Sequence, residues 1–181
     1  MHPTTLRVGF VPGVEPDRFL RRWKSGRRRA WLELVPVPLS RQHEVLESGE
    51  VDMCFVRLPL VDEALHLVPL WEERAAVVVG TEHVLSLFDE VGPEDLEGET
   101  EIPAADADDA AERIAAAATG VGFTRVPLSL ARLHHRKDAV SRPLREAAPT
   151  RIALAWPRTA DDPLRQEFVG VVRGRTARSS R

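Results

Sequence analysis

The sequence contains a single cysteine, Cys54, inside the apolar run VDMCFVRL. One cysteine cannot form an internal disulfide, and no Cys and His spacing typical of a zinc site accompanies it. The composition therefore favours a reducing cytoplasm. The chain also lacks a charged N-terminal segment followed by an apolar region, and it has no apolar run of the roughly 18 to 20 residues that cross a bilayer. We expect a cytoplasmic protein with no membrane partner.

No catalytic constellation emerges from the residues. The sequence has no G-x-S-x-G elbow, and no carboxylate pair stands out from ordinary surface charge. His134 and His135 are adjacent, so on a helix their side chains would point about 100° apart and could not easily chelate one ion. The first loop, PGVEPD, lacks the glycine pattern of a phosphate-binding loop. We therefore predict no enzyme activity, no metal and no cofactor.

The charges nearly cancel but are unevenly placed. The formal net charge of −3 excludes a bulk attraction to nucleic acid. Residues 18–29 hold seven basic side chains and no acid, whereas residues 89–112 hold eleven acids and no base. Each block is either a solvated face or a contact surface, and the partner of one block could be the other block, in the same or a second copy. One short basic cluster is a weak sign of DNA binding.

The first third of the chain alternates between strand and helix patterns. A continuous apolar run, VDMCFVRL, is typical of a strand that is covered on both faces. Asp17 is a plausible helix cap and Gly26 a plausible helix end. Short loops between these elements predict a parallel sheet with right-handed crossovers. The expected strands cover residues 6–11, 30–37 and 51–58, and the expected helices cover 17–26 and 39–49.

The rest of the chain holds further short elements around an alanine-rich segment, DADDAAERIAAAATGVGF. Its acidic start suits the positive end of a helix dipole, and Gly120 or Gly122 would end the helix. Pro93 suits the start of a short helix. The expected strands cover 65–71, 75–80, 122–126 and 150–157, and the expected helices cover 106–120, 127–135 and 161–175.

The order of these segments resembles the C-terminal effector-binding domain of LysR-type transcriptional regulators. The resemblance rests on LRVGFVPG, on LELVPVPLSRQHEVLESGEVDMCFVRLP, on LHLVPLWEERAAVVVGTEHVLS, and on AAAATGVGFTRVPLSLARLHH followed by RIALAWP. Each motif is loose, but their order and spacing cover residues 5 to about 172. The G-x-V-D-x-x-x-V-R pattern from Gly49 to Arg57, followed by PLWEE, is the most specific part.

The resemblance implies an α/β protein with a two-lobed, periplasmic-binding-protein-like fold of the second type and a small-molecule cleft between the lobes. We expect lobe I from residues 1–73 plus 151–172, lobe II from 74–150, and a disordered basic tail over 173–181. The family usually has a strand, a helix and a strand where only EGETEIPAADAD stands, so we expect a reduced second lobe. No helix-turn-helix precedes the first strand, so we expect no direct DNA binding by this chain alone.

In the family, the loop after the first strand contacts the effector, often through a Ser or Thr. The matching positions are Pro12, Gly13 and Val14, which carry no hydroxyl. Backbone N–H groups of Gly13 and Val14 at a helix start could still donate to an anion, although Glu15 would disfavour one. The alternative is a plain tight turn.

Arg57 ends a predicted strand and precedes Leu58, so its guanidinium should emerge at the carboxyl edge of the sheet, where α/β proteins bind ligands. A carboxylate held bidentately is its natural ligand. The alternative is an ion pair with an acid at the same edge. The candidate acids are Asp62, Glu72 and Glu73.

The resemblance implies further effector contacts from the second lobe at Ala105, Asp106, Phe123 and Pro127. For Asp106 a helix cap is the stronger interpretation, and for Phe123 a core position is. The implied function is the sensing of a small effector, such as a carboxylate, by a homodimer. The alternative is a structural or interaction domain that kept the fold and lost the pocket.

Overall fold

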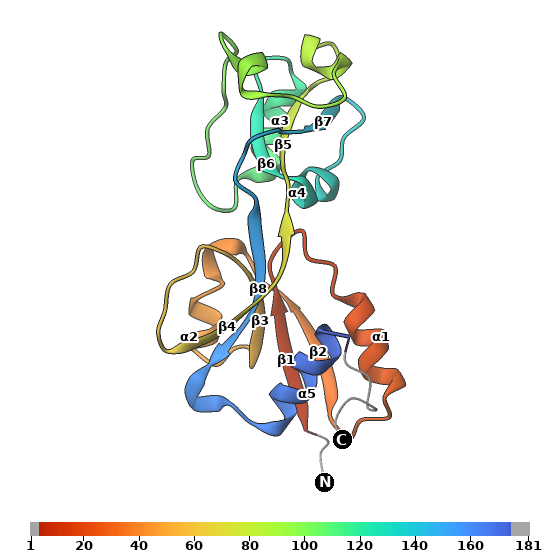
Figure 1. Cartoon of the computed structure of the whole chain (residues 1–181), viewed down its shortest axis with the longest axis vertical. Coiled ribbons are helices and arrows are strands. Elements are labelled where there is room, and N and C mark those ends of the chain that lie inside the picture. The colour runs from red at the N-terminus through yellow and green to blue at the C-terminus, as the bar shows by residue number, and fades with distance from the viewer. Residues whose placement is uncertain (1–3, 175–181) are drawn as a thin grey trace. The chain divides into compact units, whose positions relative to one another are not determined.

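The computed structural model describes residues 4–174, so most of the expected tail over 173–181 lies outside the described residues. The chain divides into two compact units (Figure 1). Unit 1 contains the chain up to Trp71 and again from Arg151, and unit 2 contains Glu72–Thr150. Because the chain leaves unit 1 and returns to it, unit 2 is an insertion between two strands of one sheet.

Unit 1 is built on a five-stranded sheet in the order β2-β1-β3-β8-β4. β1 is parallel to β2 and to β3, which confirms the predicted β-α-β-α-β sheet, whereas β8 runs antiparallel to β3. All five residues of β3 are buried, as its uninterrupted apolar run predicts. The strands are β1 (Thr5–Phe10), β2 (Trp31–Pro36), β3 (Met53–Arg57), β4 (Leu65–Glu73) and β8 (Thr150–Pro157).

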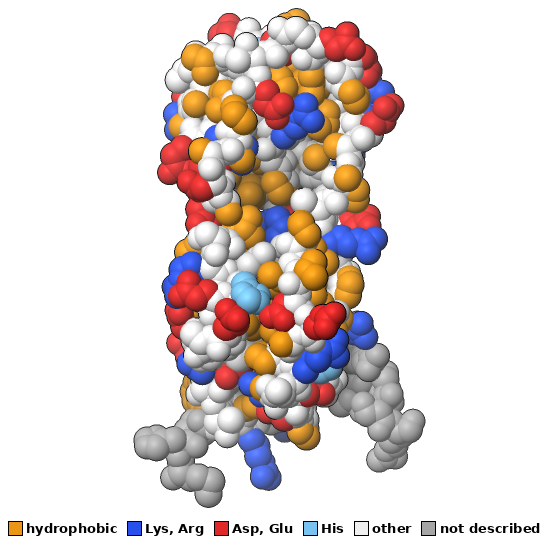
Figure 2. Space-filling model, turned by 90° about the vertical axis from the view of Figure 1, so that its left-hand side faces the viewer, with side chains coloured by type: hydrophobic (Ala, Val, Ile, Leu, Met, Phe, Trp, Pro, Cys, Tyr) orange, Lys and Arg blue, Asp and Glu red, His pale blue; other side chains and the backbone are white. Residues whose placement is uncertain are grey.

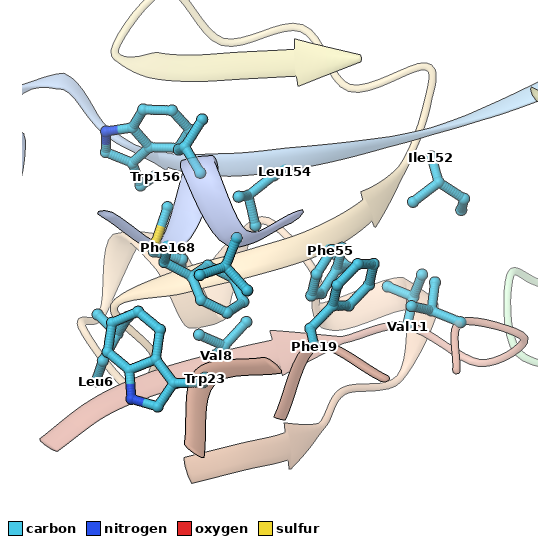
Figure 3. Packing of buried hydrophobic residues seen from close by; sticks show 14 residues of the cluster. Leu6, Val8, Val11, Phe19, Trp23, Phe55, Ile152, Leu154, Trp156 and Phe168 are labelled. Carbon is cyan, nitrogen blue, oxygen red and sulfur yellow. The ribbon is translucent and has the colours of Figure 1, made fainter. Parts of the chain in front are cut away.

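Two helices, α1 (Asp17–Ser25) and α5 (Pro163–Val172), pack side by side against the same hydrophobic core (Figure 1). Phe19 of α1 stacks on Phe55 of β3 at 5.3 Å, and Trp23 meets Phe168 of α5 edge-on at 5.8 Å (Figure 3). Gly26 caps α1 as predicted. Asp17 is its first residue and Pro16 holds the cap position, so the prediction that Asp17 caps the helix is wrong.

The other face of the sheet is covered by a broken helix. The helix expected over 39–49 is a 3₁₀ turn (Leu39–Arg41) followed by a four-residue helix, α2 (Glu44–Glu47). The break falls at Gln42, whose side chain bonds both backbone groups of Arg57 on β3 and so holds the chain against the sheet edge. Val45 and Leu46 still point inward, where they pack with Cys54.

Unit 2 contains a three-stranded antiparallel sheet in the order β6-β5-β7. The sequence pattern does not predict β7, because AVSRP carries an arginine and a proline and shows no clean alternation. No helix or strand forms between Leu96 and Ala110, all of which is described. The elements are β5 (Ala75–Gly80), β6 (Thr124–Pro127), β7 (Ala139–Pro143), α3 (Ala110–Ala118), α4 (Leu128–Leu133) and 3₁₀ turns at Val84–Leu87 and Pro93–Leu96.

Candidate functional site

The loop between β1 and α1 is a tight turn that begins at the carboxyl end of β1. The Val14 N–H donates to the Val11 carbonyl at 3.2 Å, and Gly13 adopts a φ of 92°, a conformation that strongly favours glycine. Val14 itself is buried in the unit 1 core. The Val14 N–H that was expected to face a ligand is therefore used inside the turn.

Arg57 lies at the carboxyl end of β3, beside this loop. It is only 5% exposed, and its Nη1 donates to the Pro12 carbonyl oxygen at 3.0 Å. Gln42 fixes the backbone of Arg57 from both sides, since its Oε1 accepts from the Arg57 N–H at 2.9 Å and its Nε2 donates to the Arg57 carbonyl at 3.0 Å. Two of the predicted site residues, Pro12 and Arg57, are thus brought together by the parallel pairing of β1 and β3.

The residues after Arg57 have structural roles. The Leu58 N–H donates to the Arg151 carbonyl at 2.8 Å, and its side chain packs against the apolar cluster under α2. Asp62, one of the acids considered for Arg57, instead lies 2.7 Å from His43 Nε2. This contact, together with the Ala64 N–H, holds the pKa of Asp62 below its usual range.

In unit 2 the predicted residues are held by local contacts. The Ala105 and Asp106 N–H groups both donate to the Asp109 carboxylate, at 2.6 and 3.4 Å. Asp106 accepts from the Asp108 N–H, while Asp109 occupies the cap position of α3, so the prediction that Asp106 caps this helix is wrong. Phe123 is 2% exposed and belongs to the core, as its preferred interpretation stated. Pro127 ends β6 and precedes α4. Effector contacts of these residues stay a prediction.

Sequence reasoning missed the environment of Glu73. This residue is 7% exposed at the end of β4, and its carboxylate accepts from Ser129 Oγ at 2.5 Å and from Thr150 Oγ1 at 3.3 Å. The three residues come from strand ends and a helix start that are far apart in the sequence. The only signal was a hydroxyl two residues after Pro127 in PLSL, a pattern too common to single out.

The other chemical candidates have no support as reactive groups. Burial raises the pKa of the Cys54 thiol to about 12, so it stays a protonated core side chain. Among residues 4–174, no group of three His, Cys, Asp or Glu side chains is placed to hold a metal ion. Within the same range no helix is both long and apolar enough to span a membrane.

The acidic block of residues 89–112 and the basic block of residues 18–29 differ in how many of their side chains form ion pairs. Most of the acidic block is paired inside unit 2, with Glu90 and Glu94 on Arg145 and Glu101 on Arg125. In the basic block only Arg28 has an ion pair within the described residues, at 2.6 Å from Glu167. On the face that Figure 2 shows, positive and negative side chains are interspersed.

Comparison with known proteins agrees with this architecture. Residues 2–102 match the family described as "LysR substrate binding domain", which is more than half of the chain. The chain belongs to this family. A curated relative, the Hca operon transcriptional activator HcaR of Escherichia coli (strain K12), is 27% identical over 96 residues, which is 51% of this chain. The chain spans 32% of the length of that relative.

Solved LysR-type structures extend the match to the whole fold. The BenM effector binding domain with its effector benzoate superposes with a TM-score of 0.77 at 21% identity, covering 99% of this chain and 95% of that one. The OxyR regulatory domain from Pseudomonas aeruginosa gives 0.73 at 18% identity, covering 98% and 99%. The two-sheet α/β architecture is therefore the type 2 periplasmic-binding-protein-like fold of LysR effector-binding domains, as the sequence predicted.

Proposed function

We propose that this chain is an effector-sensing domain that binds a small organic acid in the cytoplasm, with the loop at Pro12 and the Arg57 guanidinium of unit 1 as binding groups. The observation that carries the proposal is the 3.0 Å contact between Arg57 Nη1 and the Pro12 carbonyl. It places a cation and a glycine-containing loop at the carboxyl ends of two adjacent parallel strands, where α/β proteins bind ligands.

A carboxylate suits this position for chemical reasons. The guanidinium is a planar fork of N–H donors that matches the two oxygens of a carboxylate. Gln42 fixes the backbone of Arg57 and the Pro12 carbonyl holds its Nη1, so the guanidinium is positioned before a ligand arrives. Family membership supports the same proposal, as does the structural likeness to BenM, a protein whose effector is benzoate.

The test is a thermal-shift screen with small mono- and dicarboxylates, aliphatic and aromatic, each beside its neutral amide. A ligand at 100 times its Kd stabilises the folded state by about 2.7 kcal/mol, a clear rise in melting temperature. We expect at least one acid to raise the melting temperature while its amide does not. Arg57→Met should abolish the response, and Arg7→Met, which removes a partly exposed arginine of β1 that pairs with Asp52, should keep it.

Two results would contradict the proposal. One is the absence of any shift across the carboxylate panel. The other is a response in the Arg57→Met protein that equals that of the unaltered chain, measured against each protein's own baseline.

We further propose that the chain forms a homodimer. Besides the family resemblance, the support is Trp31, which is 64% exposed on the edge strand β2, an unusual place for a large aromatic side chain. Sedimentation equilibrium should give twice the chain mass, and Trp31→Glu should shift it toward the monomer. A monomeric chain at all concentrations up to about 100 μM, where interfaces of ordinary affinity are occupied, would end this proposal.

A further inference from the structure

A surface rich in positive charge lies on α1 and on the turn that follows it. We call it the basic surface, and it consists of Arg21, Arg22, Lys24, Arg27 and Arg29. All of these residues are exposed, and within residues 4–174 none of them forms an ion pair. The two other cations of the basic block are already engaged. Arg18 stacks on the rings of Phe19 and Trp71. Arg28 pairs with Glu167.

The three cations on α1 cover the side of the helix that faces away from the core. At about 100° per residue, Arg21 lies opposite the midpoint between the buried residues Phe19 and Trp23. Arg22 and Lys24 lie on the two flanks of Arg21, so the charges spread over about 160° of the helix circumference. One small anion cannot face all of them, whereas an extended partner with several carboxylates can.

Arg28 holds the turn that carries the other two cations. Its Nη1 donates to two carbonyl oxygens in the last turn of α1, at 3.1 and 3.0 Å, and its guanidinium carbon lies 4.8 Å from the Trp23 ring centroid. Trp23 Nε1 donates to the Ala30 carbonyl at 2.9 Å and so closes the turn. Arg27 and Arg29 flank the anchored Arg28 and are exposed, so their charges extend from a backbone that is already held in place.

The backbone of Arg27 has a conformation that favours glycine. Its φ is 51°, and it directly follows the C-cap residue Gly26, at the position where many helices carry a glycine. A side chain other than glycine is disfavoured there, because its Cβ approaches a backbone carbonyl oxygen. Within residues 4–174 the Arg27 side chain has no hydrogen bond or ion pair that would offset this cost. Its charge is therefore a candidate for a role outside the fold.

The charge of the whole chain favours a short acidic partner over DNA. The formal net charge is −3, so the long-range field of a duplex meets a protein that is acidic outside the basic surface. A short acidic segment contacts the basic surface alone. The guanidinium groups suit such a segment, because each can hold a carboxylate through two parallel hydrogen bonds.

A second copy of this chain is a poor partner for the basic surface. Contact between two copies of α1 would oppose like charges. The acidic block of a second copy is largely in use, since Glu90 and Glu94 pair with Arg145 and Glu101 pairs with Arg125 inside unit 2.

We propose that the basic surface binds an extended acidic segment of another protein. Carboxylates of the segment pair with the cations of α1 and continue onto Arg27 and Arg29 in the turn. Neither Pro12 nor Arg57 belongs to the basic surface, so this binding is independent of the proposed effector binding.

The test is fluorescence anisotropy of the whole chain with a labelled peptide of alternating glutamate and serine. A length of about 12 residues, roughly 40 Å when extended, is greater than that of α1. We expect saturable binding that weakens as the salt concentration rises. A matched peptide of alternating glutamine and serine should not bind at the same concentrations. A labelled DNA duplex of about 20 base pairs should bind more weakly than the glutamate peptide, because it also meets the acidic remainder of the chain.

Variants separate the basic surface from general charge effects. Arg21→Gln with Arg27→Gln should weaken binding of the glutamate peptide about tenfold, the equivalent of two surface ion pairs. Arg132→Gln with Lys137→Gln removes two exposed cations of unit 2 and should leave the binding unaltered. Arg57→Met should bind the peptide normally, so failure of the effector proposal and failure of this one give different results.

Arg27→Gly separates partner binding from a structural role of the side chain. Glycine adopts the left-handed conformation without a steric cost, so we expect the melting temperature to rise by about 2 to 4 °C. Binding of the glutamate peptide should nevertheless weaken about threefold, the equivalent of one surface ion pair. A fall in melting temperature together with unaltered peptide binding would instead show that Arg27 serves the fold.

Three other results would contradict the proposal. The first is a glutamine peptide that binds as tightly as the glutamate peptide. The second is a DNA duplex that binds more tightly than the glutamate peptide, which would make nucleic acid the partner. The third is a change in the mass of Arg21→Gln with Arg27→Gln in sedimentation equilibrium, which would show that a second copy covers the basic surface.

Discussion

Arg57 Nη1 donates a hydrogen bond to the carbonyl oxygen of Pro12 at 3.0 Å, across 45 residues of sequence. This contact ties the end of β3 to the loop after β1, while Gln42 holds the Arg57 backbone. The loop at Pro12 and the Arg57 guanidinium are therefore structurally coupled, and a substitution in one is expected to change the position of the other.

Arg57→Met tests this coupling through stability. The substitution keeps the aliphatic volume but removes the donor, so the partly buried Pro12 carbonyl loses a charged partner. We expect the free energy of unfolding to fall by about 1 to 3 kcal/mol, measured by urea denaturation. The matched change at partly exposed Arg7 should cost less than about 1 kcal/mol, as ion pairs near the surface do. Equal losses in the two variants would show that the Arg57 contact contributes no more stability than the Arg7 ion pair.

The Asp162 side chain should stabilise α5 by capping its start. Its Oδ1 accepts from the Arg165 N–H at 2.8 Å, one of the N–H groups that has no partner within the helix. We expect Asp162→Ala to lower the free energy of unfolding by about 1 kcal/mol, in urea denaturation. Asp162→Asn keeps the side-chain acceptor, so its free energy of unfolding should fall clearly less than that of Asp162→Ala. If both variants lose the same amount, the ion pair with Arg165 and not the cap is responsible.

Cys54 should be unreactive in the folded protein. The thiol is buried beneath α2, and burial raises its pKa to about 12, so thiolate is scarce at pH 8. We expect a thiol reagent such as 5,5′-dithiobis(2-nitrobenzoate) to label no cysteine in the native chain and one after unfolding in guanidinium chloride. Fast labelling of the native chain would mean that the cover formed by α2 opens readily.

The contact between Asp62 and His43 predicts a pH-dependent contribution to stability. The pKa of Asp62 is lowered by its hydrogen bond with His43 and by the Ala64 N–H. A carboxyl group whose folded pKa is depressed contributes stability above its unfolded pKa, about 4, and this stability is lost as the pH falls through the folded pKa. We therefore expect Asp62→Asn to lower the urea midpoint at pH 6 to 7 and to converge with the unaltered chain below about pH 4. A difference that is constant down to pH 2.5 would exclude this carboxylate as its source.

The elements with strong local signals were the ones that sequence reasoning placed well. The apolar run of β3, the turn residues after β1 and the glycine at Gly26 act over a few neighbouring residues, so the pattern and the local geometry coincide. The break at Gln42 and the strand β7 were missed, because each depends on a partner far along the chain: the backbone of Arg57 for Gln42, and β5 for β7.

The sequence by itself determined the parallel core of unit 1, the order of the strands and helices other than β7, and the family resemblance, since all of these follow from hydrophobic period, turn chemistry and segment order. Tertiary structure alone decided which polar groups meet. The Arg57 guanidinium reaches Pro12, Glu73 accepts from Ser129, and Arg18 stacks on Trp71. Such contacts depend on strand order and helix packing, which bring together residues far apart in the sequence. No local sequence pattern predicts these pairs.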